Sequence, residues 1–197
     1  PMHGTVIRNT GNSYVVRLDD GRELECKVKG NFRLRGIRST SPVAVGDRVT
    51  VAASAVRGAA DAAAHGDAVH YITEIGERRN YIVRKASNLS KQSHILAANV
   101  DLAVLVVTVA RPETSTTFVD RFLASAEAYR VPVVLAFNKA DEFSADERDT
   151  TGYLMALYRE VGYDCHLVSA RTGYGLDALG QAMAGRVCLL AGHSGVG

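Results

Sequence analysis

Strand-like runs, the first of which is a continuous apolar run, alternate with segments of helical spacing throughout the second half of the chain. The runs are DLAVLVVTVA (101–110), VPVVLAFN (131–138), DCHLVSA (164–170) and RVCLLAG (186–192). A strand that is apolar on both faces is typical of a parallel sheet with helices on both sides. The helical segments between the runs are 115–130, 144–162 and 175–185. We therefore predict a doubly wound α/β fold, whose ligands bind at the carboxyl ends of the strands.

The first 75 residues have a different pattern, made of short alternating or β-branched runs. These runs are GTVIR (4–8), SYVVRL (13–18), ELECKV (23–28), DRVTV (47–51) and HYITEI (70–75). DDG (19–21) indicates a hairpin, because glycine accepts a positive φ at little cost. Five short strands predict a closed barrel over residues 1–75, and the OB-fold is the commonest candidate. The Ala- and Gly-rich stretch 52–68 is interpreted as a long loop, with an Ala-rich helix as the alternative.

Charge is distributed unevenly between the two halves, although the net charge is only +2. Residues 1–100 contain 15 lysines and arginines against 9 acidic residues, whereas residues 101–197 contain 8 against 12. A basic half beside an acidic half indicates that the first half faces a polyanion, with scattered solvated charge as the alternative. We interpret the loosely patterned segment 76–98 as a basic connector that leads into an α/β domain over 99–197.

The three cysteines Cys26, Cys165 and Cys188 are far apart and show no CxxC spacing. We therefore predict no metal site within this chain. Cys165 and Cys188 lie in apolar, strand-like runs, where a buried and unreactive thiol is expected. The cysteine usage fits a reducing compartment, so we expect a cytoplasmic protein. No segment approaches the roughly 18 consecutive apolar residues of a membrane span.

The tetrapeptide NKAD directly follows the apolar run 131–138. The carboxylate of Asp141 can accept both the N1–H and the exocyclic amine of guanine, a charge-assisted pair that adenine cannot offer. Asn138 can bond another edge of the base and tie neighbouring loops together, and the stem of Lys139 can pack along the ring plane. The alternative is a polar turn in which Asn and Asp cap the backbone.

SARTG, residues 169–173, follows the next strand and is expected to reach the same base. The backbone N–H of Ala170 would face the O6 atom of guanine, and Ser169 would brace the loop. Serine and glycine after a strand are ordinary turn chemistry. The position of this loop is the more specific feature, because it lies one helix and one strand after NKAD.

The chain ends in GHSGVG, which matches the first six positions of the phosphate loop G-x-x-x-x-G-K-[ST]. Glycines allow main-chain N–H groups to turn inward around phosphates. The phosphate-binding candidates are Gly192, His193, Ser194, Gly195, Val196 and Gly197. The Lys and Ser/Thr that would contact phosphate and Mg²⁺ lie beyond Gly197, so no catalytic residue can be assigned. We interpret His193 as a variable loop position rather than a catalytic base.

The order of these motifs is unusual, because the base-reading loops precede the phosphate loop. A circular permutation explains this order, since sheet packing does not depend on where the termini are cut. With the barrel before them, LAANVD (96–101), NKAD, SARTG and GHSGVG resemble the YjeQ/RsgA family of circularly permuted ribosome-assembly GTPases. The similarity spans essentially the whole chain. The permuted order is its specific part, because many GTPases share each motif singly.

The resemblance implies a GTPase that hydrolyses GTP to GDP with Mg²⁺, stimulated by the small ribosomal subunit and acting late in its maturation. It also implies contact with rRNA through the barrel, and a C-terminal zinc domain outside this chain. We expect the sequence to stop at Gly197 because order fails within the phosphate loop, with a chain that was cut at this point as the alternative. We also expect a monomer that does not associate with membranes. One alternative is an RNA-binding adaptor that holds GDP or GTP without turnover. An adenine-specific ATPase is disfavoured by Asp141.

Basic residues of the barrel are the candidates for rRNA contact, because OB-folds bind single strands through basic grooves and aromatic platforms. They are Lys27, Lys29, Arg33, Arg35 and Arg38, with Phe32 available for stacking. The alternative is that Phe32 belongs to the core and the charges only solvate the barrel. Further phosphate contacts in the connector could come from Arg78, Arg79, Arg84, Lys85 and Lys91.

Overall fold

The computed structural model describes residues 1–11, 13–28, 42–54, 69–85 and 93–197. The chain forms two compact units, residues 1–99 and residues 100–197. Within the described residues, no helix is both long enough and apolar enough to cross a membrane.

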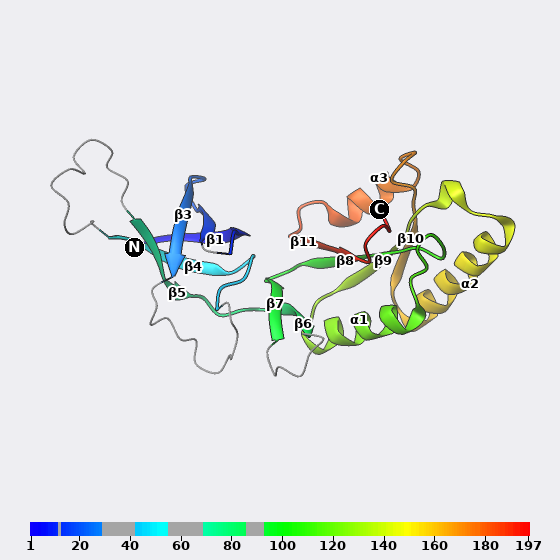
Figure 1. The fold of residues 1–197 in the computed structure, drawn as a ribbon, viewed down its shortest axis with the longest axis horizontal. Helices are drawn as coiled ribbons and strands as arrows, with labels where there is room; N and C mark the ends of the chain where they lie inside the picture. Colours follow the sequence, from blue (N-terminus) through cyan, green and yellow to red (C-terminus); the bar gives the residue numbers. More distant parts are fainter. Residues whose placement is uncertain (12, 29–41, 55–68, 86–92) are drawn as a thin grey trace. The chain divides into compact units, whose positions relative to one another are not determined.

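The first unit contains a closed five-stranded barrel with the strand order β1-β2-β3-β5-β4 (Figure 1). Its strands are β1 (Met2–Asn9), β2 (Tyr14–Leu18), β3 (Glu23–Val28), β4 (Arg48–Ser54) and β5 (Val69–Ile75). β3 and β5 pair in parallel, and the other neighbours pair antiparallel. The predicted five-stranded barrel is confirmed. Of the Ala- and Gly-rich stretch, residues 52–54 extend β4 and 55–68 lie outside the described residues.

Alternate side chains of the barrel strands fill its interior. The buried cluster consists of Val6, Tyr14, Val16, Leu18, Cys26, Val43, Val49, Val51 and Ile72. Fully burying one aliphatic side chain of this size contributes about 1.5–3 kcal/mol. The β-branched runs seen in the sequence therefore supply both the strand geometry and the core.

A two-stranded antiparallel sheet follows the barrel, formed by β6 (Tyr81–Lys85) and β7 (Ser93–Ala98). It lies in the segment that was interpreted as a connector. Two contacts join it to the barrel: Asn99 Nδ2 donates to the carbonyl of Gly46 at 3.0 Å, and the N–H of Ala98 donates to the carbonyl of Val45 at 2.8 Å. This part of the chain is therefore structured as part of the first unit.

The second unit is a parallel sheet in the order β10-β9-β8-β11 (Figure 1). Its strands are β8 (Leu102–Val107), β9 (Val133–Phe137), β10 (Asp164–Leu167) and β11 (Cys188–Gly192). All five residues of β9 are buried, as expected for a strand covered on both faces. The predicted α/β fold is confirmed.

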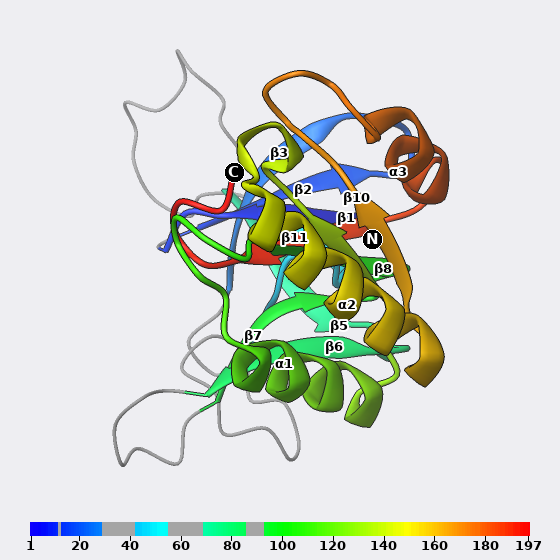
Figure 2. The same ribbon diagram turned by 90° about the vertical axis from the view of Figure 1, so that its right-hand side faces the viewer.

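Three helices and a short 3₁₀ turn connect these strands: α1 (Thr116–Ala128), η2 (Ala140–Glu142), α2 (Ala145–Val161) and α3 (Leu176–Met183). α3 covers one face of the sheet, where Leu179 packs with Leu102 and Val104. α1 and α2 lie side by side on the other face (Figure 2), and the Tyr158 hydroxyl donates to the Asp120 carboxylate at 2.9 Å. Side chains at successive strand positions point to opposite faces, so each strand serves both layers.

All three thiols are free, and their burial differs. Burial raises the pKa of Cys26 and of Cys165 to about 11, which makes both thiols poor nucleophiles at neutral pH. The expectation of a buried thiol holds for Cys165. Cys188 is only half-buried, because it lies on β11 at the edge of the four-stranded sheet.

Candidate nucleotide-binding site

Four loops leave the carboxyl ends of the parallel strands in the second unit. They are the β8–α1 loop (108–115), the NKAD loop (138–141), the SARTG loop (169–173) and the glycine-rich loop (192–197). Because the four strands run in parallel, these loops share one edge of the sheet, where α/β folds bind ligands. The sequence motifs therefore lie at one edge, as predicted.

Asn138 ties three of these segments together. Its side chain is buried: Nδ2 donates to the carbonyl of Val196 at 2.8 Å, and Oδ1 accepts from the N–H of Ala170 at 2.9 Å. The structure thus shows the loop-tying role that was expected of this residue. The Ala170 N–H, which was expected to face O6 of guanine, donates to Asn138 instead.

Asp141 is held by two donors from the SARTG loop. Oδ1 accepts from the Ser169 hydroxyl at 2.5 Å, and Oδ2 accepts from Arg171 Nε at 2.7 Å. The Ser169 hydrogen bond, and after it the Arg171 guanidinium, lower the pKa of Asp141 below its usual value. The buried Ser169 hydroxyl also accepts from the N–H of Thr172 at 3.2 Å, so it braces the loop as predicted. The site therefore presents an ionised carboxylate at neutral pH.

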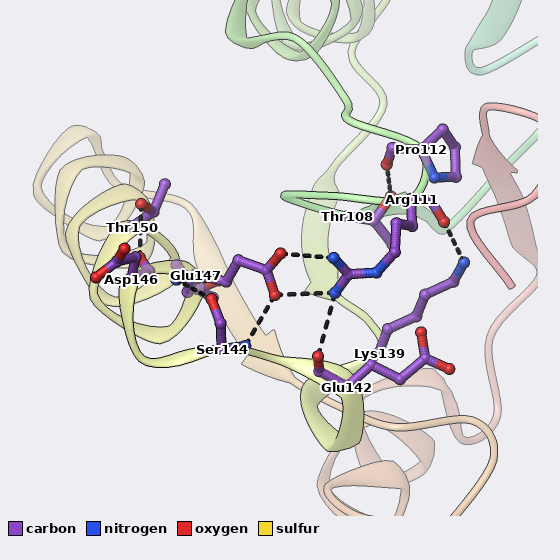
Figure 3. Close-up of polar contacts among 10 residues, drawn as sticks. Thr108, Arg111, Pro112, Lys139, Glu142, Ser144, Asp146, Glu147 and Thr150 are labelled. Carbon is purple, nitrogen blue, oxygen red and sulfur yellow. Dashed lines mark hydrogen bonds and ion pairs between the residues drawn. The ribbon is translucent and has the colours of Figure 1, made fainter.

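Lys139 has a left-handed backbone, with φ of 69°, which is uncommon for a residue other than glycine. Its ammonium group donates to the carbonyl of Arg111 at 2.5 Å (Figure 3). The aliphatic stem of Lys139 consequently bridges from the NKAD loop to the β8–α1 loop. This course of the side chain is compatible with a stem that packs along a base.

The β8–α1 loop was not identified from the sequence, because TVARPETS matches no motif. Three hydrogen bonds fold it back on itself. The Thr108 hydroxyl donates to the Pro112 carbonyl at 2.5 Å, the N–H of Thr114 donates to the Thr108 carbonyl at 2.8 Å, and the N–H of Thr108 donates to the Thr114 hydroxyl at 3.2 Å. Arg111 leaves this loop toward α2, where it contacts Glu147 (Figure 3). In the sequence, the one feature that could have pointed to this loop is the pair Arg111-Pro112, a positively charged residue followed by proline.

The glycine-rich loop packs closely against its neighbours. A Cβ at Gly192 would lie 2.8 Å from Val196 Cγ2 and 2.9 Å from the Val106 carbonyl, so only glycine fits there. A Cβ at Gly195, where φ is 85°, would lie 3.5 Å from the Pro112 ring. Val196 is buried, whereas Gly192, His193, Ser194, Gly195 and Gly197 are exposed. The loop thus leaves most of its main chain open to a ligand.

The His193 side chain contacts an aromatic ring. Its ring centroid lies 4.0 Å from that of Phe118, at an interplanar angle of 42°. Phe118 lies in the first turn of α1, so the contact joins the glycine-rich loop to the end of the β8–α1 loop. The interpretation of His193 as a variable loop position stays a prediction.

The RNA-binding candidates are mostly outside the described residues. Lys27 is exposed on β3 of the barrel, and Lys29, Phe32, Arg33, Arg35 and Arg38 lie in the segment that the structure does not describe. Lys91 also lies outside the described residues, while Arg84 and Lys85 belong to β6.

Arg78 was a candidate for a phosphate contact, but its side chain is buried in an ion pair with Asp47. Its side chain is 8% exposed, and Nε and Nη2 each donate to a carboxylate oxygen of Asp47 at 2.7 Å. Asp47 is fully buried and also accepts from the N–H of Ala44. A buried charge needs a partner of this kind, so Arg78 stabilises the first unit and is not available to RNA. The exposed neighbour Arg79 donates to the carbonyl of Asn99.

Comparison with known proteins gives consistent matches over both units. Residues 75–197 match the family model of the RsgA GTPase, and residues 3–58 match that of the RsgA N-terminal domain. Over 196 residues the chain is 57% identical to a small ribosomal subunit biogenesis GTPase RsgA of Bacteroides fragilis. It is 56% identical to the protein of the same name in Porphyromonas gingivalis.

All of the chain is covered in both of these alignments, against 60% and 59% of the two relatives. Two solved structures also match it over its whole length. YjeQ from Thermotoga maritima has a TM-score of 0.72 at 31% identity, with 62% of that chain covered. YloQ, a circularly permuted GTPase, has a TM-score of 0.66 at 29% identity, also with 62% covered. The chain spans about 60% of the length of these relatives, and it belongs to the RsgA GTPase family.

Proposed function

We propose that the second unit binds GTP and GDP, and that the protein hydrolyses GTP during maturation of the small ribosomal subunit. The observation that carries this proposal is the Asn138 side chain, which joins the NKAD, SARTG and glycine-rich loops at one edge of the sheet. A base bound beside Asp141 would therefore lie next to the loop that can hold its phosphates. The names of the relatives, which are small ribosomal subunit biogenesis GTPases, support the biological role.

In this proposal Asp141 reads guanine. Its ionised carboxylate accepts the N1–H and the exocyclic amine, and Lys139 lies along the ring plane. Ser169 and Ala170 brace the pocket from the SARTG loop. Adenine offers no matching pair of donors, so the site selects guanine by charge-assisted hydrogen bonding.

Phosphate binding is assigned to Gly192, His193, Ser194, Gly195, Val196 and Gly197 through their main-chain N–H groups. These residues suit an anion rather than a cation, and among the described residues no cluster of three or more metal-ligating side chains occurs. From the phosphate-loop pattern, we expect Mg²⁺ to be held by phosphate oxygens and by the Ser/Thr that lies beyond Gly197. When bound, it would neutralise charge that develops on the transferred phosphoryl group.

Contact with rRNA is assigned to the barrel, with Lys27 exposed on β3 and the remaining candidates at Lys29, Phe32, Arg33, Arg35 and Arg38. Binding through such cations releases counterions from the RNA, so affinity for the subunit falls steeply as salt is raised. Action on ribosomal subunits would place the protein in the cytoplasm. We also expect it to act as a monomer.

The variant Asp141→Asn tests the base pocket in the full-length protein. The amide donor suits the C2 carbonyl of xanthine and loses the guanine pair, so GDP affinity falls by at least about 100-fold and XDP affinity rises. Fluorescence titration with both nucleotides measures the change. Asp149→Asn, on the exposed surface of α2, serves as the matched control and binds GDP normally. A variant that kept its GDP affinity and gained none for XDP would refute the assignment.

Turnover is tested separately by measuring GTP hydrolysis by the full-length protein with and without small ribosomal subunits. Faster hydrolysis with subunits supports the GTPase role. GTP binding without turnover under both conditions would instead favour a nucleotide-binding adaptor.

A further inference from the structure

The β8–α1 loop contacts both parts of the proposed nucleotide site. The Arg111 carbonyl accepts from Lys139 Nζ in the NKAD loop at 2.5 Å. On the other side, the Pro112 ring lies against Gly195 of the glycine-rich loop, within 3.5 Å of where a Cβ would be. A loop without any sequence motif therefore touches the base side and the phosphate side together.

An ion pair fixes this loop to α2. Arg111 donates to both carboxylate oxygens of Glu147, from Nη1 at 2.7 Å and from Nη2 at 2.9 Å (Figure 3). Nη2 also donates to the main-chain carbonyl of Glu142 at 3.1 Å. A two-pronged contact of this kind defines the orientation of the guanidinium as well as its distance.

Glu147 is itself fixed, so it is a firm anchor for Arg111. It forms a capping box with Ser144: its carboxylate accepts from the Ser144 N–H at 2.9 Å, and its own N–H donates to the Ser144 hydroxyl at 3.2 Å. The Glu147 side chain is 20% exposed, whereas that of Arg111 is 56% exposed. The start of α2 is thus the fixed partner, and it holds the β8–α1 loop through Arg111.

The backbone at Arg111 also needs such support. Arg111 has φ of 51° and Lys139 has φ of 69°, and both values are uncommon for residues with a Cβ. Surrounding contacts must therefore maintain these conformations. The ion pair with Glu147 holds the Arg111 side chain, and the hydrogen bond from Lys139 to the Arg111 carbonyl joins the two residues.

We propose that Arg111, paired with Glu147, is a positioning residue for nucleotide binding: it holds its own carbonyl where Lys139 can reach it. This keeps the Lys139 stem extended beside the base and the β8–α1 loop against the glycine-rich loop. The inference rests on the proposed function, because Lys139 is there assigned to the guanine ring plane. Arg111 itself does not touch the nucleotide in this arrangement.

The test compares Arg111→Ala, Arg111→Lys, Glu147→Gln and the double variant Arg111→Ala/Glu147→Gln in the full-length protein. Gln at position 147 can still complete the capping box, so it removes the ion pair without removing the cap. Arg148→Ala, on the exposed surface of α2, removes an arginine without touching the β8–α1 loop and is the matched control. Stopped-flow fluorescence with labelled GDP and labelled IDP gives association and dissociation rates.

Both Arg111→Ala and Glu147→Gln are expected to release GDP about threefold to fivefold faster, the range of a partly exposed ion pair. Arg111→Lys keeps the charge without the two-pronged geometry and lies between them and the wild type. The double variant releases GDP no faster than Arg111→Ala, because the two residues act as one unit. The GDP-to-IDP affinity ratio stays at the wild-type value, because the Lys139 stem contacts both rings alike.

Release rates equal to the wild type in both single variants would overturn the inference and leave the proposed function standing. A changed GDP-to-IDP ratio would also overturn it, because the effect would then pass through Asp141. Wild-type protein that binds no guanine nucleotide would refute the proposed function, and the inference with it. Thermal melting of each variant confirms that it is folded at the assay temperature.

Discussion

Both carboxylate oxygens of Asp141 accept from protein donors, and Arg171 occupies Oδ2 through Nε and Nη2. The Arg171 guanidinium therefore lies at the carboxylate oxygen of Asp141 that is proposed to bind guanine. The Arg171 side chain is 71% exposed and can turn aside into solvent. An exposed ion pair contributes about 0–1 kcal/mol, so under the proposed function this contact would slow base entry without preventing it.

Arg171→Ala is accordingly expected to speed association of GDP up to about fivefold, because Asp141 no longer has to exchange one partner for another. Stopped-flow association rates measure the effect in the full-length protein. Arg186→Ala, another exposed arginine of the second unit, is the control and should leave the rate unchanged. A slower rate in Arg171→Ala would show that this guanidinium assists the base rather than competing with it.

The start of α2 is the element that anchors the β8–α1 loop. The Arg111 guanidinium, and after it the Ser144 N–H, lower the pKa of Glu147 to about 2 from its ordinary 4.5. A carboxyl whose pKa is lower in the folded state stabilises that state fully above the unfolded value. This stabilisation disappears as the pH falls through the folded value.

The variant Glu147→Gln should therefore melt below the wild type at pH 6, and the gap between their melting temperatures should shrink between pH 4.5 and pH 2. Differential scanning calorimetry at several pH values measures the gap. Glu160→Gln, at the other end of α2, should show no such trend. A gap that stayed constant down to pH 2 would contradict the role of the Glu147 charge.

At the scale of the molecule, Asn138 connects segments that are far apart in sequence. It joins the end of β9 to Ala170 and to Val196; its own side chain and the contact with Val196 are buried, and the contact with Ala170 is partly buried. Asn138→Ala leaves the Val196 carbonyl and the Ala170 N–H without their hydrogen-bond partner, which costs about 1–3 kcal/mol of folding free energy. Urea unfolding of the second unit measures this loss. Gln181→Ala, exposed on α3, is the control and should unfold like the wild type.

The elements of both units could be predicted from the sequence, since strand and helix periods are local properties. All residues of β8 and β9 are apolar because both strands are covered on both faces. The β6–β7 sheet was not predicted, because its strands are short and their pairing and the hydrogen bond from the Ala98 N–H to the Val45 carbonyl are tertiary contacts.

The sequence by itself determined the barrel, the permuted order of the motifs and the edge of the sheet at which they meet. Only the tertiary structure decided the partners: Ala170 with Asn138, Arg171 with Asp141, Arg78 with the buried Asp47. It also showed that a loop without a motif reaches Lys139 through Arg111. The physical reason is that spacing along the chain places a side chain on an element. Its hydrogen-bond partner depends on which distant loops packing brings within about 3 Å.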